Sequence, residues 1–225
     1  MDIILTLLNT NSDFRRTNVP LSIPLVVHAI AGAGKTHILT TLLERCTDCC
    51  VHTLGQPILR SSNHRGSGGP RRSLNVLDEY QLAASFEGYE VLFGDPLQGP
   101  ADKEYPEAHY INSKSKRYGQ QTCTLLNHIG IQCTSTRADS VSVRHPFGAT
   151  PIGTVIVLDS EAADYLTAHS VRSKRVCEVL GQTYPVTTVL LTKRFAEYSR
   201  RELYIAFTRH RYQLLILSPY AASRT

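Results

Sequence analysis

Short runs of apolar residues alternate along the chain with segments whose apolar residues recur every three or four positions. The runs predict buried β-strands, because apolar runs of about four to eight residues are typical of sheets covered on both faces. They lie at Pro24–Ile30, Cys50–Leu54, Leu74–Leu77, Tyr89–Phe93, Thr154–Leu158, Val186–Thr192 and Tyr212–Leu217. The segments of helical period lie at Thr36–Cys46, Ser160–Ala168 and Ala196–Ala206. Alternating strands and helices predict an α/β fold with parallel sheets.

Two polar passages interrupt this alternation. Residues 60–73 (RSSNHRGSGGPRRS) are rich in Gly, Ser and Arg, which predicts an exposed, mobile, basic loop. Residues 99–121 contain two prolines and a cluster of basic side chains, as passages between compact domains often do. We therefore expect two small α/β domains, one over residues 1–112 and one over residues 113–225.

The composition is that of a globular protein. The chain has 225 residues, of which 42% are hydrophobic and 19% are charged, whereas disordered chains are poorer in apolar residues. No run reaches the roughly 18 uninterrupted apolar residues of a membrane span, so none is expected. The first ten residues, MDIILTLLNT, carry Asp2 where a signal peptide has positive charge, and we expect no signal peptide.

Six cysteines in a chain of this length do not indicate a disulfide framework, and we expect free thiols in a reducing compartment. Cys46, Cys49, Cys50 and His52 lie close enough in sequence to suggest zinc. Structural zinc sites, however, usually take two pairs of ligands separated by a loop. The spacing therefore favours small buried side chains at a helix–strand junction.

Charge is divided unevenly between the two expected domains. Residues 1–112 carry 9 basic and 12 acidic side chains, a net charge of −3, whereas residues 113–225 carry 15 and 7, a net charge of +8. Such an excess suggests a polyanionic partner for the second half. The alternative is a basic surface that only maintains solubility.

The strongest chemical signal is the sequence AGAGKT at residues 31–36, which follows a predicted strand and begins a predicted helix. Glycines there let backbone N–H groups approach phosphates, and the helix N-terminus favours negative charge. Lys35 would neutralise the β- and γ-phosphates, and the Thr36 hydroxyl would bind Mg²⁺. The full pattern has glycine where this chain has Ala29. The predicted ATP-binding residues are Gly32, Ala33, Gly34, Lys35 and Thr36.

Two further motifs end later strands. In LDEY, Asp78 fits the carboxylate that holds Mg²⁺, and Glu79 can act as the general base that activates water. In FGDPLQ, Gln98 can reach the γ-phosphate.

Near the C-terminus, Arg209 in YIAFTRHR can stabilise transition-state charge. The alternative for Arg209 is a basic helix end favoured by the helix dipole.

Taken together, GAGKT, LDEY, GDPLQ and YIAFTRHR resemble the superfamily 1 helicases of positive-strand RNA viruses. The position of the phosphate loop and the segment Phe14–Thr36 are similar to one branch, the triple gene block protein 1 of potexviruses and carlaviruses. The resemblance covers nearly the whole chain. It implies two RecA-like P-loop domains, with motifs I to III in the first and motifs IV to VI in the second, and ATP and Mg²⁺ as cofactors.

The resemblance also implies sites for RNA. Thr53 and Gly55 match motif Ia and Thr183 lies in a segment similar to motif V, and both motifs contact nucleic acid. Arg137 lies where motif IV is expected, but the usual Arg-Phe-Gly is Arg-Ala-Asp here. Arg209 matches the motif VI arginine.

The biology of the family is implied in the same way. The resemblance implies single-stranded viral RNA as a partner, together with self-association and contacts with other viral movement proteins and coat protein. It implies cell-to-cell transport of viral RNA through plasmodesmata, suppression of RNA silencing and location in the host cytoplasm.

Two alternatives to an RNA-stimulated NTP hydrolase stay open. A P-loop kinase of small molecules would use Lys35 and Asp78 but has no need of a basic half or of motif VI. A non-enzymatic scaffold would bind RNA and host proteins and use ATP as a conformational ligand. ATP hydrolysis measured with and without single-stranded RNA distinguishes the three.

Overall fold

The computed structural model describes residues 1–58 and 73–221 and divides them into two compact units, Met1–Lys114 and Ser115–Thr225. We call these the N-terminal and C-terminal units. The division falls within the polar passage 99–121, two residues beyond the expected end of the first domain. The predicted basic loop lies, except for Ser73, outside the described residues.

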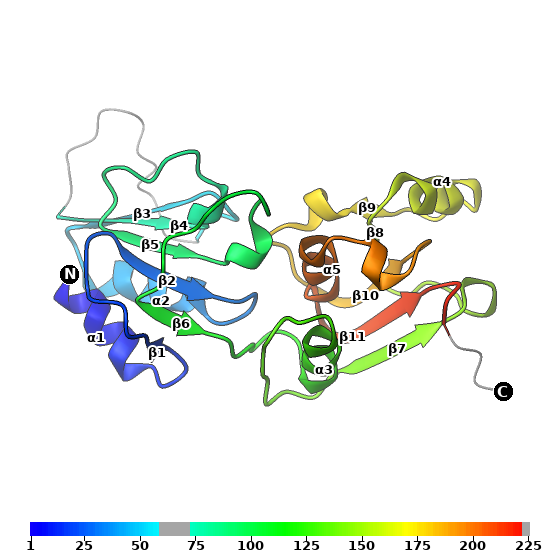
Figure 1. Ribbon diagram of the computed structural model, residues 1–225, viewed down its shortest axis with the longest axis horizontal. Helices are drawn as coiled ribbons and strands as arrows, with labels where there is room; N and C mark the ends of the chain where they lie inside the picture. Colours follow the sequence, from blue (N-terminus) through cyan, green and yellow to red (C-terminus); the bar gives the residue numbers. More distant parts are fainter. Residues whose placement is uncertain (59–72, 222–225) are drawn as a thin grey trace. The chain divides into compact units, whose positions relative to one another are not determined.

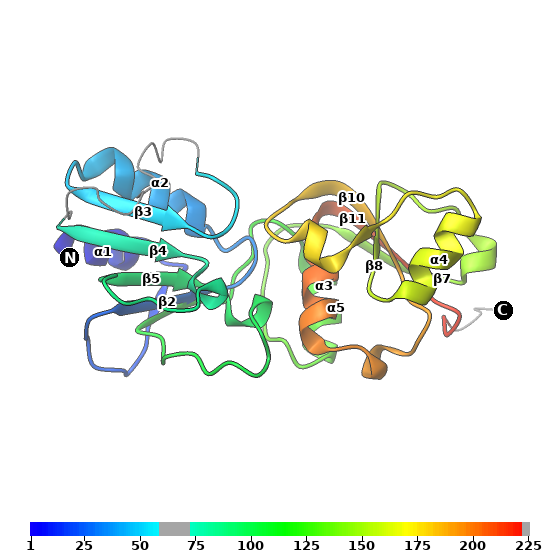
Figure 2. The same ribbon diagram turned by 90° about the horizontal axis from the view of Figure 1, so that it is seen from above.

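The N-terminal unit is built around a sheet whose described strands follow the order β1-β6-β2-β5-β4-β3. All neighbouring strands run parallel except β1, which pairs antiparallel with β6. Figures 1 and 2 show this sheet from two sides. Its elements are α1 (Asp2–Thr10), β1 (Arg15–Arg16), β2 (Leu25–Ala29), α2 (Lys35–Arg45), β3 (Cys49–Thr53), β4 (Leu74–Asp78), η1 (Tyr80–Leu82), β5 (Val91–Gly94), η2 (Pro96–Gln98) and β6 (Tyr110–Asn112).

The central strands of this unit are buried along most of their length, as their apolar sequences predict. Every residue of β4 and β5 is buried, as expected for a parallel sheet covered on both faces. Helix α1, which the sequence analysis did not predict, buries Ile4, Leu7 and Leu8. It packs against α2. Cys49 and Cys50 are buried in β3, as small side chains at a helix–strand junction should be.

The C-terminal unit contains a second sheet, in which all described strands are parallel and follow the order β7-β11-β10-β8-β9. Helices α3 and α5 lie side by side in both ribbon views. The elements are α3 (Gln120–His128), β7 (Ser140–Arg144), η3 (Pro146–Gly148), β8 (Thr154–Val157), α4 (Ser160–Ala168), β9 (Lys174–Arg175), η4 (Val176–Val179), β10 (Tyr184–Leu190), η5 (Phe195–Glu197), α5 (Arg200–Phe207) and β11 (His210–Leu217).

The predicted fold class is confirmed, and one predicted helix is wrong at its start. Helix α5 begins at Arg200 and not at Ala196, because Ser199 forms a capping box with Glu202. The Ser199 hydroxyl accepts the Glu202 amide, and the Glu202 carboxylate accepts the Ser199 amide, so the helix begins there. The polar passage 99–121, in which the sequence analysis placed no strand, contains β6 and the fully buried Tyr118.

Candidate active site

The predicted phosphate-binding loop, residues 31–36, connects β2 to α2. Gly32 and Gly34 have φ angles of 78° and 89°, a left-handed conformation that side chains other than glycine rarely adopt. Gly34 is the N-cap of α2, and Lys35 is its first residue. The first amides of α2 therefore lie at the end of this loop, where a helix N-terminus can bind an anion. Thr36 is exposed in the first turn of the helix.

The Lys35 side chain is buried and bonded to the loop itself. Its Nζ donates to the carbonyl oxygen of Ala29 at 2.9 Å and lies 3.9 Å from Oε1 of Glu79. Ala29 stands where the full pattern has glycine, and it is a buried residue of β2. Alanine can therefore replace glycine here, because its side chain is buried in the sheet and Lys35 bonds to its backbone carbonyl.

Asn112 at the end of β6 holds the loop from the neighbouring strand. Its Nδ2 donates to the carbonyl of Ala33 at 2.9 Å, and its own carbonyl accepts the amide of Ile30 at 3.1 Å. The side chain is 2% exposed. The sequence analysis assigned Asn112 no role, because no local pattern shows that the end of β6 lies beside the loop.

Asp78, the last residue of β4, has the properties of a metal-binding carboxylate. Oδ2 accepts the hydroxyl of Thr53 at 3.2 Å, whereas the buried Oδ1 has no hydrogen-bond partner among the described residues. Burial, followed by the charge of Glu79, raises the pKa of Asp78 to about 7, against the opposing effect of Lys35. A cation at Oδ1 would satisfy this atom and favour the ionised carboxylate. The residues present therefore fit Mg²⁺.

Glu79 directly follows in an uncommon backbone conformation. Its φ and ψ are 57° and 39°, in the left-handed region. Non-glycine residues in this region are strained by about 1–3 kcal/mol and cluster at functional sites. The carboxylate lies between the ammonium of Lys35 and the side-chain amide of Gln81, which donates to Oε2. A Cβ on Gly55 would approach Cγ of Glu79 to 3.1 Å, so the end of β3 lies against it.

A chain of polar contacts continues from Glu79 to the third motif. Gln81 accepts the amide of Asp95 at its Oε1, at 3.2 Å, while its Nε2 bonds Glu79. Asp95 in turn accepts Nε2 of Gln98 at 2.7 Å. Lys35, Glu79 and Gln98, which the sequence placed in separate motifs, are thus connected through Gln81 and Asp95. The sequence analysis assigned neither linking residue a role, although Asp95 lies within FGDPLQ and Gln81 directly follows LDEY.

Close packing explains the glycine in the third motif. A Cβ on Gly94 would approach Oε1 of Gln81 and the ring of Tyr80 to 2.6 Å. Tyr80 is fully buried, and its hydroxyl lies 2.6 Å from Nε2 of His28. Burial lowers the pKa of His28 to about 4. The polar chain therefore lies beside a packed, uncharged pair, Tyr80 and His28.

In the C-terminal unit, Arg209 lies in the short connection between α5 and β11. Its side chain is 1% exposed and is held by two local acceptors. Nε donates to the carbonyl of Ile205 at 3.0 Å, and Nη2 donates to the hydroxyl of Thr208 at 2.8 Å. The guanidinium therefore has a defined orientation within its own unit.

Two further predicted residues, Thr183 and Arg137, lie in the same unit. Thr183 is half-buried and directly precedes β10. Arg137 is exposed, and its carbonyl accepts the amide of Gln120, which begins α3. Thr53 and Gly55 belong to the N-terminal unit, where the structure groups them with Asp78 and Glu79. Among the described residues, no cluster of three or more His, Cys, Asp or Glu side chains could hold a metal ion by itself.

Comparison with known proteins agrees with this arrangement. The viral superfamily 1 RNA helicase core domain matches residues 25–218. The movement and silencing protein TGBp1 of Papaya mosaic potexvirus is 35% identical, over 92% of this chain and 91% of its own. TGBp1 of Lily virus X is 36% identical, over 91% and 95%. TGBp1 of Chrysanthemum virus B is 35% identical, over 99% and 98%.

Solved structures support the fold. A PRRSV helicase matches with a TM-score of 0.60 at 16% identity, over 88% of this chain and 53% of its own. An arterivirus nonstructural protein 10 helicase, solved in complex with DNA, matches with a TM-score of 0.53 at 16% identity, over 90% and 56%. The chain thus spans about half the length of these helicases. Within the described ranges, no helix is long and apolar enough to cross a membrane.

The match to the helicase core extends over most of the chain, and the TGBp1 relatives align over nearly all of it. Both findings confirm the predicted resemblance to the helicases and to TGBp1. This chain belongs to the viral superfamily 1 RNA helicase core family and, within it, to the TGBp1 movement and silencing proteins.

Proposed function

We propose that this protein is an RNA-stimulated NTP hydrolase that binds ATP with Mg²⁺ and single-stranded viral RNA. One observation carries the proposal: the continuous polar chain Lys35–Glu79–Gln81–Asp95–Gln98, beside the unpaired buried oxygen of Asp78. A buried carboxylate with a raised pKa next to a lysine and a helix N-terminus is typical of a functional site.

The mechanism follows from the positions of these side chains. The amides at the start of α2 and the ammonium of Lys35 bind the triphosphate and neutralise its charge. Glu79 accepts the proton of the attacking water, whose oxygen forms a bond to the γ-phosphorus while the bond to the β–γ bridging oxygen breaks. The Lys35 ammonium lies 3.9 Å from Oε1 of Glu79. Phosphate binding would draw the ammonium away and leave the carboxylate free to accept a proton.

Asp78 and the hydroxyl of Thr36 would hold Mg²⁺. When bound, this cation neutralises charge that develops on the phosphate oxygens. Thr53 keeps the Asp78 carboxylate oriented through its bond to Oδ2. Gln98, bonded to Asp95, is proposed to respond to the γ-phosphate, and Arg209 to stabilise the transition-state charge as the motif VI arginine.

The C-terminal unit carries the charge expected for RNA binding. RNA backbones are bound mainly through phosphate charge, with little sequence readout. Thr183 and the motif Ia residues Thr53 and Gly55 are proposed RNA contacts. Within the described part of the C-terminal unit, the exposed lysines and arginines are Lys116, Arg137, Arg144, Arg172, Arg175, Lys193, Arg194, Arg200 and Arg211.

The relatives named as movement and silencing proteins extend the proposal to the infected cell. We include transport of viral RNA between cells through plasmodesmata and suppression of RNA silencing, in the host cytoplasm. Self-association and contacts with other movement proteins and coat protein belong to the same proposal. Complementation of a movement-deficient viral genome by the wild-type chain, with Lys35→Ala beside it, tests transport.

ATP turnover with and without single-stranded RNA tests the biochemical core of the proposal. Lys35→Ala should lower kcat/KM for ATP by about 10²-fold or more, because it removes a charge that pairs with the transferring phosphoryl group. Arg45→Ala is the matched control. It removes an exposed positive charge at the other end of α2 and should leave turnover within about twofold.

The outcomes separate the alternatives. RNA-stimulated hydrolysis that depends on Lys35 supports the proposal. ATP binding without hydrolysis favours a scaffold that uses ATP as a conformational ligand. Transfer of phosphate to a small molecule, unaffected by RNA, favours a kinase.

A further inference from the structure

Asp139 is an acidic residue that the proposed function leaves unexplained. It ends the segment Arg137-Ala138-Asp139, at a position where the helicase resemblance leads us to expect glycine. The structure buries its side chain completely and surrounds the carboxylate with four donors. These are the Gly119 amide at 2.8 Å, the Gln121 amide at 2.9 Å, the Thr122 hydroxyl at 2.6 Å and Nε2 of His210 at 3.2 Å.

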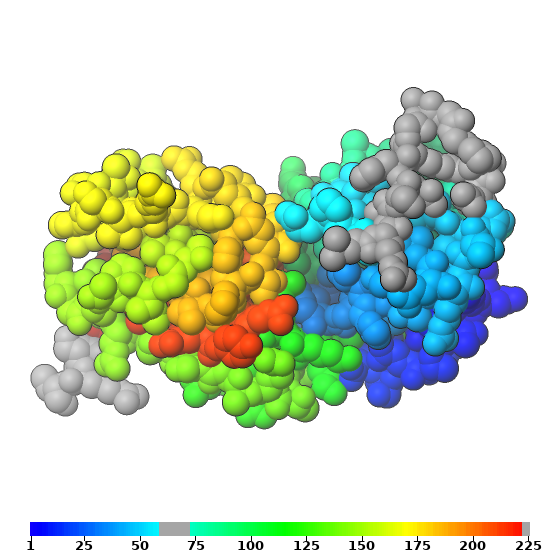
Figure 3. Space-filling model, turned by 180° about the vertical axis from the view of Figure 1, so that it is seen from behind, coloured from blue at the N-terminus to red at the C-terminus, as the bar shows by residue number. Residues whose placement is uncertain are grey.

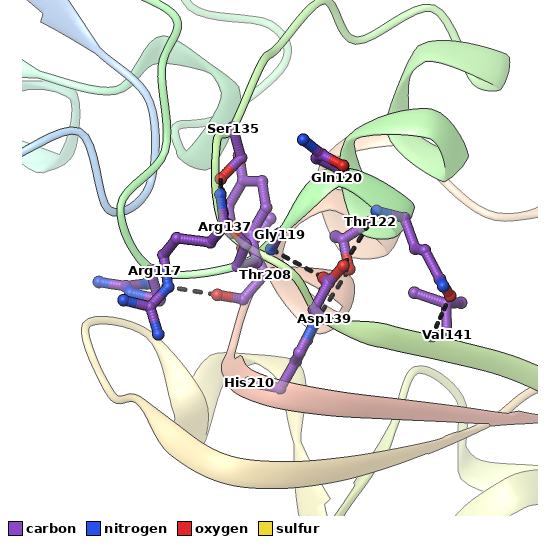
Figure 4. Close-up of polar contacts among 12 residues, drawn as sticks. Arg117, Gly119, Gln120, Thr122, Ser135, Arg137, Asp139, Val141, Thr208 and His210 are labelled. Carbon is purple, nitrogen blue, oxygen red and sulfur yellow. Dashed lines mark hydrogen bonds and ion pairs between the residues drawn. The ribbon is translucent and has the colours of Figure 1, made fainter.

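The arrangement defines which groups donate. A carboxylate can only accept, so Nε2 of His210 must carry the proton of that bond. The Thr122 hydroxyl donates its one proton to Asp139. Its oxygen lies 3.0 Å from the same Nε2, so the single N–H of His210 is shared between the Asp139 carboxylate and the Thr122 oxygen. One carboxylate thus joins the first turn of α3, the segment before β7 and the first residue of β11. Figure 4 shows these groups converging on Asp139.

His210 directly follows Arg209, and the two residues share one short turn. Only Thr208 and Arg209 separate α5 from β11, so a shift at the start of the strand would move Arg209. Two further hydrogen bonds reach the turn from outside α5. The Tyr184 amide, at the start of β10, donates to the Arg209 carbonyl at 2.8 Å, and Nη1 of Arg117, before α3, donates to the Thr208 carbonyl at 3.4 Å.

We propose that Asp139 is a positioning residue for NTP hydrolysis, which holds the turn carrying Arg209 by anchoring His210 to the start of α3. The inference rests on the proposed function of Arg209. Without the carboxylate, the His210 N–H and two amides of α3 lose a charged acceptor. The start of β11 is then less firmly held, and the Arg209 guanidinium loses its fixed orientation. Transition-state stabilisation should suffer more than ATP binding, because it depends on accurate geometry.

The chain offers a closely matched control in Asp159. This carboxylate also caps a helix of the C-terminal unit, accepting the Ala162 amide at 2.7 Å and the hydroxyls of Tyr198 and Thr192 at 2.6 and 3.0 Å. No residue of the predicted motifs contacts it among the hydrogen bonds of the described residues. Asp139→Asn and Asp159→Asn therefore remove the same charge from similar sites, and only the first is connected to Arg209.

The experiment compares both variants with wild type by two readouts. The first is exchange of the buried Arg209 Nε proton with solvent, followed by NMR on ¹⁵N-arginine-labelled protein and identified by its loss in Arg209→Lys. The second is ATP turnover. Asp139→Asn should accelerate exchange and lower kcat by about tenfold each, with KM within about twofold, because the interaction matters mainly in the transition state. Asp159→Asn should change neither readout.

Thr122 supplies a conservative rescue within the same cluster. Thr122→Val removes the hydroxyl that donates to Asp139 and should reproduce part of the loss, whereas Thr122→Ser keeps the donor and should restore both readouts. Unchanged exchange in Asp139→Asn would overturn the proposal, as would an equal loss of kcat in Asp159→Asn. If wild type hydrolyses ATP no faster than Lys35→Ala, the proposed function fails, and the exchange measurement still decides whether Asp139 orients Arg209.

Discussion

At the scale of single residues, the candidate site depends on polar groups that are expensive to bury. Asp78 has one unpaired buried oxygen, and Glu79 has a left-handed backbone. Both features lower the stability of the folded chain. A bound cation and triphosphate would offset this cost, because they bring the charges that these groups face. The division of roles between the two carboxylates can be tested directly.

Glu79→Gln should separate the base from the metal ligand. The substitution removes the proton acceptor but keeps the shape of the side chain and leaves Asp78 intact. Turnover should fall by about 10²-fold or more, while ATP affinity stays within about threefold. Single-turnover hydrolysis and equilibrium binding of a fluorescent ATP analogue measure the two quantities. The exposed Glu87→Gln in the same unit is the control. Normal hydrolysis by Glu79→Gln would place the base elsewhere.

At the scale of elements, carboxylates or hydroxyls cap the N-termini of α3, α4 and α5, but the capping residue does not always lie next to the helix in sequence. Asp159 and Ser199 cap α4 and α5 from the N-cap position itself. Helix α3 has no side-chain cap of its own at Gly119, and Asp139 supplies one from 20 residues away. The stability of α3 therefore depends on a tertiary contact, which has two consequences.

The first consequence is a dependence of stability on acid pH. Burial alone would raise the pKa of Asp139, but hydrogen bonds from His210, Thr122 and two amides outweigh it and lower the pKa to about 2. Because the folded-state pKa lies below the unfolded value of about 4, the ionised carboxylate contributes about 2 kcal/mol above pH 4. This contribution is lost as the pH falls from about 4 toward 2.

Urea unfolding between pH 6 and pH 3 measures this effect. The difference in unfolding free energy between wild type and Asp139→Asn should be largest near pH 6 and should shrink as the solution becomes more acidic. The exposed Asp164→Asn controls for the loss of one carboxylate from the same unit. A difference that stays constant with pH would contradict the assignment.

The second consequence concerns the close approach at Gly119. A Cβ there would lie 2.6 Å from the backbone nitrogen of Asp139, which cannot move without disturbing the cap. Gly119→Ala should therefore destabilise the protein by about 1–3 kcal/mol, as overpacking does. Gly148→Ala is the control, because nothing lies within 4 Å of its Cβ, and it should cost less than about 0.5 kcal/mol. Thermal unfolding of both variants gives the comparison.

At the scale of the whole molecule, charge is divided along the chain. The N-terminal 112 residues carry −3 and the remainder +8. In the C-terminal unit, one exposed aromatic residue lies among exposed basic residues at the start of β11, where Tyr212 is 57% exposed. Figure 3 shows this part of β11 (red) reaching the surface. Arg211 beside it is also exposed. Basic and aromatic side chains together suit single-stranded RNA.

RNA affinity should accordingly depend steeply on salt. A log–log plot of affinity against salt should have a slope of roughly −0.7 for each phosphate neutralised on a single strand. Arg211→Ala should weaken binding and make the slope less steep by about 0.7. Arg45→Ala in the N-terminal unit should leave the slope unchanged. Fluorescence anisotropy with an unstructured RNA measures both, and an affinity that does not change with salt would contradict the prediction.

Much of this protein is determined locally by its sequence. The alternation of apolar runs with helical periods predicted parallel α/β sheets, and GAGKT, LDEY, GDPLQ and YIAFTRHR predicted the helicase family; both predictions are confirmed. The reason is that side-chain period, glycine conformation and helix N-termini act over a few neighbouring residues. The start of α5 could also have been predicted, since Ser199 and Glu202 have the spacing of a capping box.

Only the tertiary structure decided how the motifs are connected. Asn112 holds the phosphate loop, Gln81 joins Glu79 to Asp95, and Asp139 caps a helix that begins 19 residues earlier. Each contact joins strand ends or turns that become neighbours only after the sheet has formed. Buried polar groups must find partners wherever the fold brings them. The spacing of residues in the sequence does not contain that information, because it depends on which strands pair and in which order.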